Sequence, residues 1–376
     1  MKIVQIVSRM DVLGGAQTHV FDLTKGLIEN GHEVHVLAYG EGKLTEELKN
    51  NGINFHPLRY LTLDIHPFSD LRALFEVKKR IKQINPDLIA LHSSKAGVIG
   101  RIVGKILRIP TVFTSHSWSF SSVNNITKRT VYIWIERLIG MLSTGIITVS
   151  HHDYNDGIKY NIAGRVDMKV IHNGIHDIKK KSSPKDSNVI RMVMVARFAY
   201  PKDHILLLRA LKNVQQNNWQ LTFIGDGPNI EQVKRYAKEN NVFHHIKFLG
   251  ECRNVDEHLR DAHIFLLITK SEGLPISIIE AMSAQLAIIA SNVGGIKELI
   301  DHNETGILVG RNDEDAISNA ITHLLMNNSI REQLGSEARK KYLNEFTFTK
   351  MLNETEKYYK QVLLSFHNKK KEVMEG

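Results

Sequence analysis

The stretch IFLLITKSEGLPISIIEAMSA, from Ile264 to Ala284, reads as one strand–turn–helix unit. IFLLIT is a continuous apolar run of the length of a buried strand, and SEGLP supplies Gly273 and Pro275 for a turn. ISIIEAMSA spaces its apolar residues as a helix does. Because a buried strand followed by a helix is the repeating unit of parallel sheets, the stretch predicts an α/β fold.

The same alternation extends in both directions along the chain. In the first half, KIVQIV, HEVHVLAY, DLIALHS, TVFTSH and GIITVS have the composition of strands, and THVFDLTKGLIENG and KAGVIGRIVGKILR have helical spacing. In the second half, VIRMVMVAR, WQLTFIGDG, HIKFLG, AIIAS and GILV are further strands. HILLLRALKNVQ and NIEQVKRYAKEN are helices between them. We therefore predict two doubly wound, Rossmann-like domains facing an interdomain cleft.

A polar segment separates the two halves. HNGIHDIKKKSSPKDSN is rich in Lys, Ser and Pro, which is typical of a linker, and places a hinge at 173–188. We expect an N-terminal domain at 1–172 and a C-terminal domain at 173–349. The C-terminal segment 350–376 is expected to be a helix that packs back onto the first domain and ends in a basic, solvated tail.

Composition limits the class of protein. The chain has 376 residues, 42% of them hydrophobic, with a formal net charge of +9 that is spread over both halves. It contains one cysteine, Cys252, so an intrachain disulfide is excluded and a reducing compartment fits. The sequence lacks an 18-residue apolar run, a signal-peptide core and zinc-finger spacing. We expect a cytoplasmic protein that binds phosphorylated ligands or the inner face of the membrane, and no nucleic acid.

Two glutamates flank the start of the helix in the opening stretch. In open α/β sheets ligands bind beyond the carboxyl ends of the strands, where the first N–H groups of a helix attract a diphosphate. Glu272 lies beside that anion site, and Glu280 follows about a turn into the helix. Two carboxylates placed in this way can accept hydrogen bonds from two sugars of one nucleotide sugar. The alternative is that both act only on the helix dipole.

Other segments suit phosphate binding at strand ends. Gly14 and Gly15 allow backbone N–H groups to approach a phosphate, and Arg197 and Lys202 place two cations beyond a strand. Ordinary surface charge is the alternative for both cations. FIGDGP, which includes Gly225, is a tight turn at another strand end.

Taken together, these motifs resemble glycosyltransferase family 4. The resemblance rests on Glu272-x7-Glu280, Gly14-Gly15, Arg197 with Lys202, HNGI, IGDGP and SNVGGIKELI, and it runs from the first strand to about Glu345. KAGVIGR and GGAQTHV are similar to bacterial capsule and surface-polysaccharide transferases of that family. The chain departs from the usual pattern at Gln17, where many members have Glu, and at Ala196, where Gly is usual.

The resemblance implies a GT-B fold and a role for each matching residue. Arg197 and Lys202 would bind the donor diphosphate and stabilise it as it leaves, Glu272 would hold the hydroxyls of the donor sugar, and Glu280 the ribose. His116 would reach the donor sugar from the N-terminal domain, although a packed strand-end histidine is the alternative. Donor contacts would come from Gly14, Gly15, Gly225, Cys252, Gly273, Leu274, Ile276, Ser277 and Glu280.

The resemblance also implies the reaction. The chain would be a retaining hexosyltransferase that uses a nucleotide-diphosphate sugar, with UDP-sugar as the expected donor and a lipid-linked or growing surface polysaccharide as the acceptor. In a front-side displacement the leaving phosphate deprotonates the acceptor hydroxyl, so no protein nucleophile is needed. Because Arg197 and Lys202 would neutralise the leaving diphosphate in place of a metal, we expect no metal and no cofactor. A GT-B sugar-nucleotide epimerase and a catalytically silent partner subunit are the alternatives.

The N-terminal half offers candidates for the acceptor and for a membrane. Lys95 and Arg101, in LHSSKAGVIGR, and Trp118 are possible acceptor contacts, and a solvated lysine is the alternative for Lys95. HSWSFSSVNNITKRTVYIWIERLIGML, at 116–142, mixes aromatics with cations and suits a bilayer interface. It could equally be a core helix that buries Val131, Ile135, Leu138 and Leu142.

Overall fold

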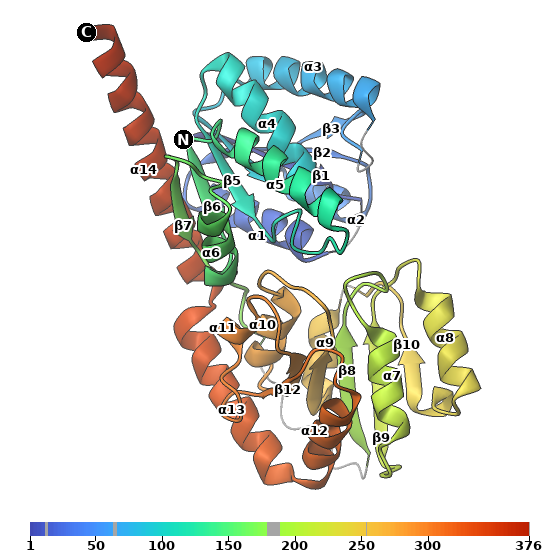
Figure 1. Ribbon diagram of the computed structural model, residues 1–376. Helices are drawn as coiled ribbons and strands as arrows, with labels where there is room; N and C mark the ends of the chain where they lie inside the picture. Colours follow the sequence, from blue (N-terminus) through green and yellow to red (C-terminus); the bar gives the residue numbers. More distant parts are fainter. Residues whose placement is uncertain (12–13, 63–65, 179–188, 253, 376) are drawn as a thin grey trace. The chain divides into compact units, whose positions relative to one another are not determined.

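In the computed structural model the chain divides into two α/β units, and the structure describes residues 1–11, 14–62, 66–178, 189–252 and 254–375. The first unit comprises residues 1–172 and 351–376, and the second comprises residues 173–350 (Figure 1). The predicted hinge lies mostly at 179–188, outside the described residues.

The first unit is built on a parallel sheet. Its seven described strands lie in the order β3-β2-β1-β4-β5-β6-β7. They are β1 (Lys2–Arg9), β2 (Glu33–Tyr39), β3 (Asn54–Leu58), β4 (Leu88–His92), β5 (Thr111–Ser115), β6 (Gly145–Thr148) and β7 (Asp167–Val170). The described helices of this unit are α1 (Gly15–Glu29), α2 (Lys43–Asn50), α3 (Pro67–Ile84), α4 (Ser94–Leu107), α5 (Ile126–Gly140), α6 (His151–Lys159) and α14 (Phe348–Glu375).

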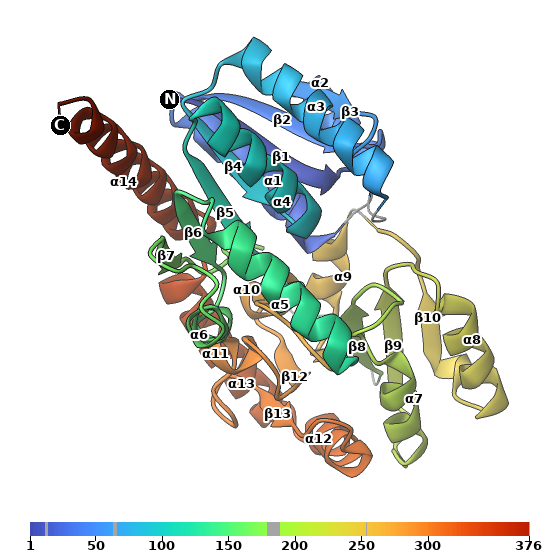
Figure 2. The same cartoon turned by 45° about the horizontal axis from the view of Figure 1, so that its top comes forward.

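Helices cover both faces of this sheet (Figure 2). Val4 and Ile6 of β1 pack in one apolar cluster with α3 and α4, whereas Val7 packs in another with α1 and α2. The alternation along β1 therefore separates the two cores, as the period of two in a strand requires. Helix α14 joins the same unit through the Tyr358 hydroxyl, which donates a 2.8 Å hydrogen bond to the Asp167 carbonyl.

The second unit repeats this plan with six described strands, all parallel, in the order β10-β9-β8-β11-β12-β13. They are β8 (Ile190–Val195), β9 (Trp219–Ile224), β10 (Ile246–Phe248), β11 (Ile264–Leu267), β12 (Ala287–Ser291) and β13 (Ile307–Val309). The α-helices described in this unit are α7 (His204–Lys212), α8 (Ile230–Glu239), α9 (Val255–Asp261), α10 (Ile276–Ser283), α11 (Ile296–Leu299), α12 (Glu314–Met326) and α13 (Asn328–Glu345), and the short 3-10 helix η1 spans Phe243–His245.

The strand order of each sheet reverses at one point. In the first unit the reversal lies between β1 and β4, and in the second it lies between β8 and β11. Loops leaving the carboxyl ends of these strand pairs diverge to opposite faces of the sheet, which opens a crevice for ligands. The predicted site residues should therefore follow these four strands.

Candidate active site

Two loops of the second unit are joined beyond its point of reversal. Lys202, after β8, forms an antiparallel bridge with Thr269, after β11. The Asp203 N–H donates to the Ile268 carbonyl at 2.9 Å and the Lys270 N–H to the Pro201 carbonyl at 3.0 Å. These backbone bonds hold the segment that carries Lys202 against the segment that leads to Glu272.

The side chains of Lys202 and Glu272 form an ion pair at this junction. Both are largely buried, with 18% of the lysine and 11% of the glutamate side chain exposed. A pair shielded to this degree holds its geometry better than a surface pair does. The ammonium and carboxylate, predicted from motifs 70 residues apart, thus lie in direct contact.

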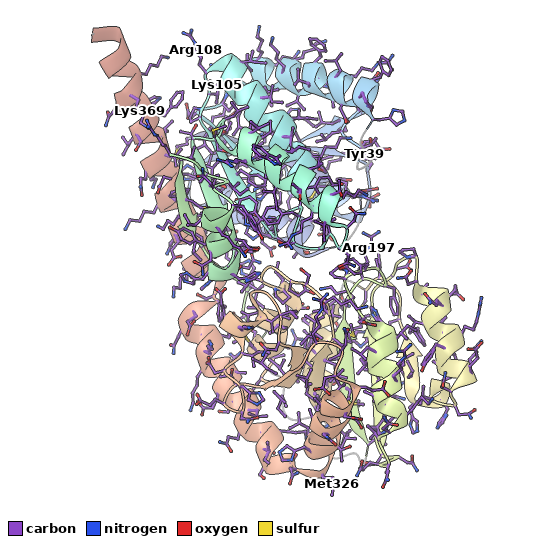
Figure 3. All side chains as sticks on the ribbon, in the orientation of Figure 1. Tyr39, Lys105, Arg108, Arg197, Met326 and Lys369 are labelled. Atoms are coloured by element: carbon purple, nitrogen blue, oxygen red, sulfur yellow. The ribbon has the colours of Figure 1, made fainter. Side chains whose placement is uncertain are left out.

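Arg197 lies just past the end of β8 and is exposed (Figure 3). Among the described residues, its guanidinium has no hydrogen bond or ion pair with another side chain. The backbone around it is tightly packed, because Gly225 has φ +137° and an added Cβ there would approach the Ala196 carbonyl to 2.2 Å. The guanidinium is therefore available to an anion at a fixed strand end.

The start of α10 follows the same loop. Pro275 is its N-cap and provides no side-chain hydrogen bond, so the first N–H groups, at Ile276 and Ser277, have no capping side chain. These groups make the helix start a site of positive potential. Gly273 and Leu274 before it are buried, and Glu280, within the helix, is half-buried.

Two residues outside the predicted set support this loop. The side-chain amide of Asn173, buried in the HNGI motif, donates a 2.8 Å hydrogen bond to the Leu274 carbonyl. Gly294 of the SNVGG segment has φ +53°, and an added Cβ would come within 1.9 Å of the Glu272 carbonyl. The HNGI and SNVGG motifs were both recognised in the sequence. Their contacts with the loop join residues more than twenty positions apart, so no local pattern predicts these contacts.

The remaining candidates for donor binding lie in other parts of the chain. Cys252 is a half-buried thiol beyond β10 of the second unit. Gly14 and Gly15 start α1 in the first unit, where Gly14 is the N-cap with extended backbone and no side-chain capping bond. An added Cβ at Gly14 would lie 2.7 Å from Gln17 Oε1, which is the end of a flexible side chain and can move away.

His116 follows β5 in the first unit and is half-buried. Its Nε2 lies 3.2 Å from Nδ1 of His92, the last residue of β4. Burial lowers the pKa of His116 to about 4, so its imidazole is neutral at physiological pH. A neutral imidazole can exchange hydrogen bonds with a hydroxyl without introducing a charge.

Two family models match consecutive parts of the chain. "Glycosyltransferase Family 4" matches residues 13–177, and "Glycosyl transferases group 1" matches residues 176–341. Together they extend over both units and over the site described above. The chain belongs to glycosyltransferase family 4.

This glycosyltransferase has full-length relatives in bacteria. It is 25% identical over 370 residues to the Escherichia coli UDP-Gal:alpha-D-GlcNAc-diphosphoundecaprenol alpha-1,3-galactosyltransferase, covering 94% of this chain and 95% of that protein. It is 29% identical over 317 residues to the E. coli O-antigen biosynthesis glycosyltransferase WbnH, covering 84% of this chain and 88% of the relative.

Solved structures place its fold in the GT-B class. Anabaena HepE in complex with UDP-glucose matches with a TM-score of 0.84 at 20% identity, covering 96% of this chain and 100% of HepE. WaaG, a glycosyltransferase involved in lipopolysaccharide biosynthesis, matches with a TM-score of 0.75 at 13% identity, over 94% and 98% of the two chains.

The acceptor predictions for Arg101 and Trp118 are wrong. Arg101 is fully buried, where its guanidinium forms a 3.1 Å ion pair with Glu136 and stacks 4.2 Å from the Phe113 ring. Trp118 is also buried, and its indole N–H donates to the Asp153 carbonyl at 2.6 Å. Neither side chain can touch an acceptor without unfolding its surroundings.

Lys95 also has a partner within the first unit. Its ammonium forms an ion pair with Asp70 of α3, and only 13% of the lysine side chain is exposed. The pair joins the start of α4 to α3. Lys95 is therefore not a solvated first-turn lysine. A role of Lys95 in acceptor binding stays a prediction.

Helix α5 does not have the predicted buried stripe, and only part of the segment predicted to meet a bilayer is exposed. Trp118 and Phe120, two of the predicted interface aromatics, are buried before the helix begins. The predicted core stripe is instead open to solvent: Val131, Ile135 and Leu138 are each at least 40% exposed. Among the described residues, no helix has the length and apolar character needed to cross a membrane.

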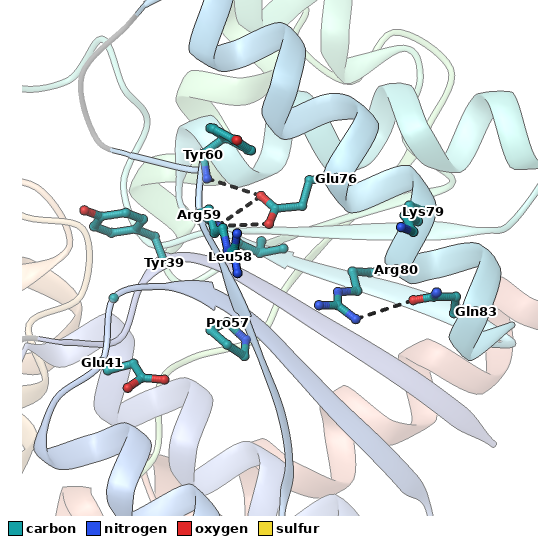
Figure 4. A pocket seen from close by; sticks show the side chains of 11 residues that line it. Tyr39, Glu41, Pro57, Leu58, Arg59, Tyr60, Glu76, Lys79, Arg80 and Gln83 are labelled. Carbon is teal, nitrogen blue, oxygen red and sulfur yellow. Dashed lines mark hydrogen bonds between the residues drawn. The ribbon is translucent and has the colours of Figure 1, made fainter.

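A cavity of about 740 Å³ lies elsewhere in the first unit, between the edge strand β3 and α3 (Figure 4). The Glu76 carboxylate at its wall accepts hydrogen bonds from the backbone N–H groups of Arg59 and Tyr60. None of the predicted site residues lines it. This cavity is therefore separate from the predicted site residues.

Proposed function

We propose that this glycosyltransferase moves a sugar from a UDP-sugar to a lipid-linked or polysaccharide acceptor during synthesis of a bacterial capsule or other surface polysaccharide. The transfer retains the anomeric configuration and needs no metal ion. The second unit binds the donor, and the first binds the acceptor.

The contact between Lys202 and Glu272 is the observation that carries this proposal. It places a cation for a diphosphate and a carboxylate for sugar hydroxyls side by side, at the point where the strand order reverses. Arg197 adds a second cation, and the uncapped start of α10 adds backbone N–H groups. This set has the charge and geometry to hold the diphosphate of a nucleotide sugar.

The relatives support the choice of substrates. The E. coli galactosyltransferase is named for a UDP-sugar donor and a diphosphoundecaprenol acceptor, and HepE has been solved with UDP-glucose. WbnH is named for O-antigen biosynthesis. We transfer the class of donor and the class of acceptor from these names, and not the identity of the sugar.

In the proposed mechanism the acceptor hydroxyl oxygen bonds to the anomeric carbon on the face from which the diphosphate departs. The bond from the anomeric carbon to the diphosphate oxygen breaks, and the hydroxyl proton passes to that leaving oxygen. Arg197 and Lys202 stabilise the negative charge that develops on the diphosphate. Glu272 orients the donor sugar, and no covalent intermediate with the protein forms.

The first test is donor binding. A ligand that binds only the folded state at 100 times its Kd raises the free energy of unfolding by about 2.7 kcal/mol. We expect UDP or a UDP-sugar to raise the unfolding temperature, GDP- and ADP-sugars to have little effect, and Arg197→Ala to abolish the shift. An equal shift with every nucleotide would contradict the choice of UDP.

The second test is turnover. Glu272→Ala and Lys202→Ala should each lower kcat by at least 100-fold while the protein remains folded. Lys234→Ala is the matched control, because it removes another ion-paired lysine of the same unit, on α8. Turnover near the wild-type level in either site variant would remove this pair from the active site.

Metal independence and stereochemistry have their own readouts. Turnover should persist in EDTA, whereas a loss that Mg²⁺ restores would refute the metal-free mechanism. The anomeric proton coupling of the product, measured by NMR, should match that of the donor sugar. Inversion would refute a front-side displacement.

We also propose that helix α5 docks this enzyme on an anionic membrane that holds its acceptor. Ile126, Trp134, Leu138 and Met141 are all more than half exposed along the helix. Lys128 is exposed on the same helix, and the Arg137 guanidinium lies 5.4 Å from the Trp134 ring centroid. An apolar face bordered by cations is typical of helices that lie in a bilayer interface.

Vesicle co-sedimentation tests this docking. The double variant Trp134→Ser/Leu138→Ser should bind vesicles of phosphatidylglycerol and phosphatidylcholine at least tenfold more weakly than the wild type. Ile158→Ser, which removes an exposed apolar residue from α6, should bind as the wild type does. Equal binding by all three proteins would refute a role for α5.

A further inference from the structure

Three histidines of the first unit converge from neighbouring elements. His19 lies on α1, which follows β1, His92 ends β4, and His116 follows β5. These three strands are adjacent in the sheet. One ring nitrogen of each histidine lies within 4.8 Å of one ring nitrogen of each of the others. The cluster therefore lies at the carboxyl ends of β1 and β4, where the strand order reverses.

The cluster contains more polar nitrogens than partners for them. His19 and His92 are both more than nine-tenths buried. Nδ1 of His19 and Nε2 of His92 have no hydrogen-bond partner among the described residues. Buried polar atoms in native proteins almost always have a partner, so the unpartnered Nδ1 of His19 points to a bound ion or water.

We propose that His19, His92 and His116 form a binding site for a divalent transition-metal ion such as Zn²⁺, with three imidazole ligands and an open fourth position. Zinc–nitrogen bonds of 2.0–2.1 Å in a tetrahedron separate the ligand nitrogens by about 3.4 Å. His92 Nδ1 and His116 Nε2 already lie 3.2 Å apart. Nδ1 of His19, which has no hydrogen-bond partner, is available as the third ligand.

This site has a consequence that rests on the proposed function. His116 is the residue assigned to the donor sugar, so a metal ion bound to it would remove its nitrogen from the reaction. Zinc should therefore inhibit transfer, and EDTA should restore it. Such a response is opposite to that of a transferase that needs its metal for catalysis.

Binding is tested without any assay of transfer. The full chain, prepared without a histidine tag and stripped of metal, is titrated with Zn²⁺ against a chromophoric chelator. Co²⁺ replaces zinc in a parallel titration, because its visible absorption reports tetrahedral nitrogen ligands. We expect one ion per chain and a rise in unfolding temperature with zinc.

Three variants locate the site. His19→Asn and His92→Asn should each weaken zinc binding at least 100-fold and abolish the intense cobalt band. His35→Asn is the matched control, since His35 belongs to a different stacked pair of the same unit, with His56. Binding unchanged in His19→Asn and His92→Asn, or no stoichiometric binding by the wild type, would overturn the proposal.

A transfer assay then separates the site from its consequence. Stoichiometric zinc binding with inhibition supports both the site and the role of His116. Binding without inhibition supports the metal site and refutes the assignment of His116 to the donor sugar. The failure of the metal site and the failure of the proposed function are thus distinguishable.

Discussion

Gly294→Ala should disable the enzyme through Glu272 without touching any proposed substrate contact. The φ of Gly294 is +53°, and an alanine Cβ at this position would lie 1.9 Å from the Glu272 carbonyl oxygen. Real Cβ atoms essentially never come closer than 3.0 Å to another heavy atom. The loop that carries Glu272 must therefore move by about 1 Å, and a displacement of that size can lower turnover by about 100-fold.

A matched substitution separates this displacement from backbone strain. Alanine in the left-handed region costs about 1–2 kcal/mol wherever it occurs. Gly52, which has φ +69°, would meet nothing within 4 Å if it carried a Cβ. Gly52→Ala should therefore lower stability by a similar strain energy and leave kcat within about twofold of the wild type.

The assay measures kcat for transfer and the free energy of unfolding in urea for both variants. We expect both to be destabilised and only Gly294→Ala to lose turnover. Donor affinity, measured by thermal shift, should fall as well, because the Lys202–Glu272 pair is disturbed with the loop. If Gly294→Ala retained the kcat of Gly52→Ala, the inferred support of Glu272 would be refuted.

Two further predictions concern stability. Glu136→Gln leaves the buried Arg101 guanidinium without its counter-ion and should lower the free energy of unfolding, measured in urea, by about 3–5 kcal/mol. The double variant Arg101→Met/Glu136→Leu is the control. A loss in Glu136→Gln no larger than the loss in this double variant would contradict the prediction. Burial lowers the pKa of His204, which stacks 4.0 Å from Phe198, to about 4, so the unfolded chain binds a proton near pH 6.5 and the folded chain only near pH 4. The contribution of His204 to the free energy of unfolding is therefore complete above pH 6.5 and is lost, by up to about 3 kcal/mol, as the pH decreases to 4. His204→Phe should reduce this pH dependence, measured by urea unfolding at a series of pH values. An unchanged pH dependence would exclude His204 as a cause.

The fold was predictable where strands are buried on both faces. β4, β8 and β11 are almost wholly apolar, and such runs have few other interpretations in an α/β chain. The edge strands β3 and β7 were missed, because they are short and partly exposed and β3 contains a proline. A strand at the edge of a sheet has no need for an apolar run, and edge positions also tolerate proline.

The site was predictable only in part. The charged residues of the second unit follow strand ends in the sequence, so the fold rule brings Lys202 and Glu272 to one edge before any contact is known. Arg101 shows the limit of that reasoning. A cation on a helix is normally solvated, and its burial depends on Glu136, which lies 35 residues further along the chain. No local pattern reveals such a partner.

The sequence could not decide what helix α5 contacts, and the reason is different. Its apolar spacing is the same for a face that packs against a core and for a face that meets a bilayer, since both exclude water. Sequence periodicity reports the existence of the face and not its partner. The exposure of Val131 and Leu138 in the structure decides against the core.

The two units place different chemistry at equivalent points of the same topology. At the reversal between β8 and β11, the second unit has two cations and a carboxylate, which suit a diphosphate whose charge increases as it leaves. At the reversal between β1 and β4, the first unit has buried imidazoles whose depressed pKa values keep them uncharged. Neutral donors and acceptors suit sugar hydroxyls, since a buried charge would have to be compensated. The same lone pairs suit a transition-metal ion, so the neutrality that we propose fits His116 for a sugar would also make this cluster sensitive to zinc.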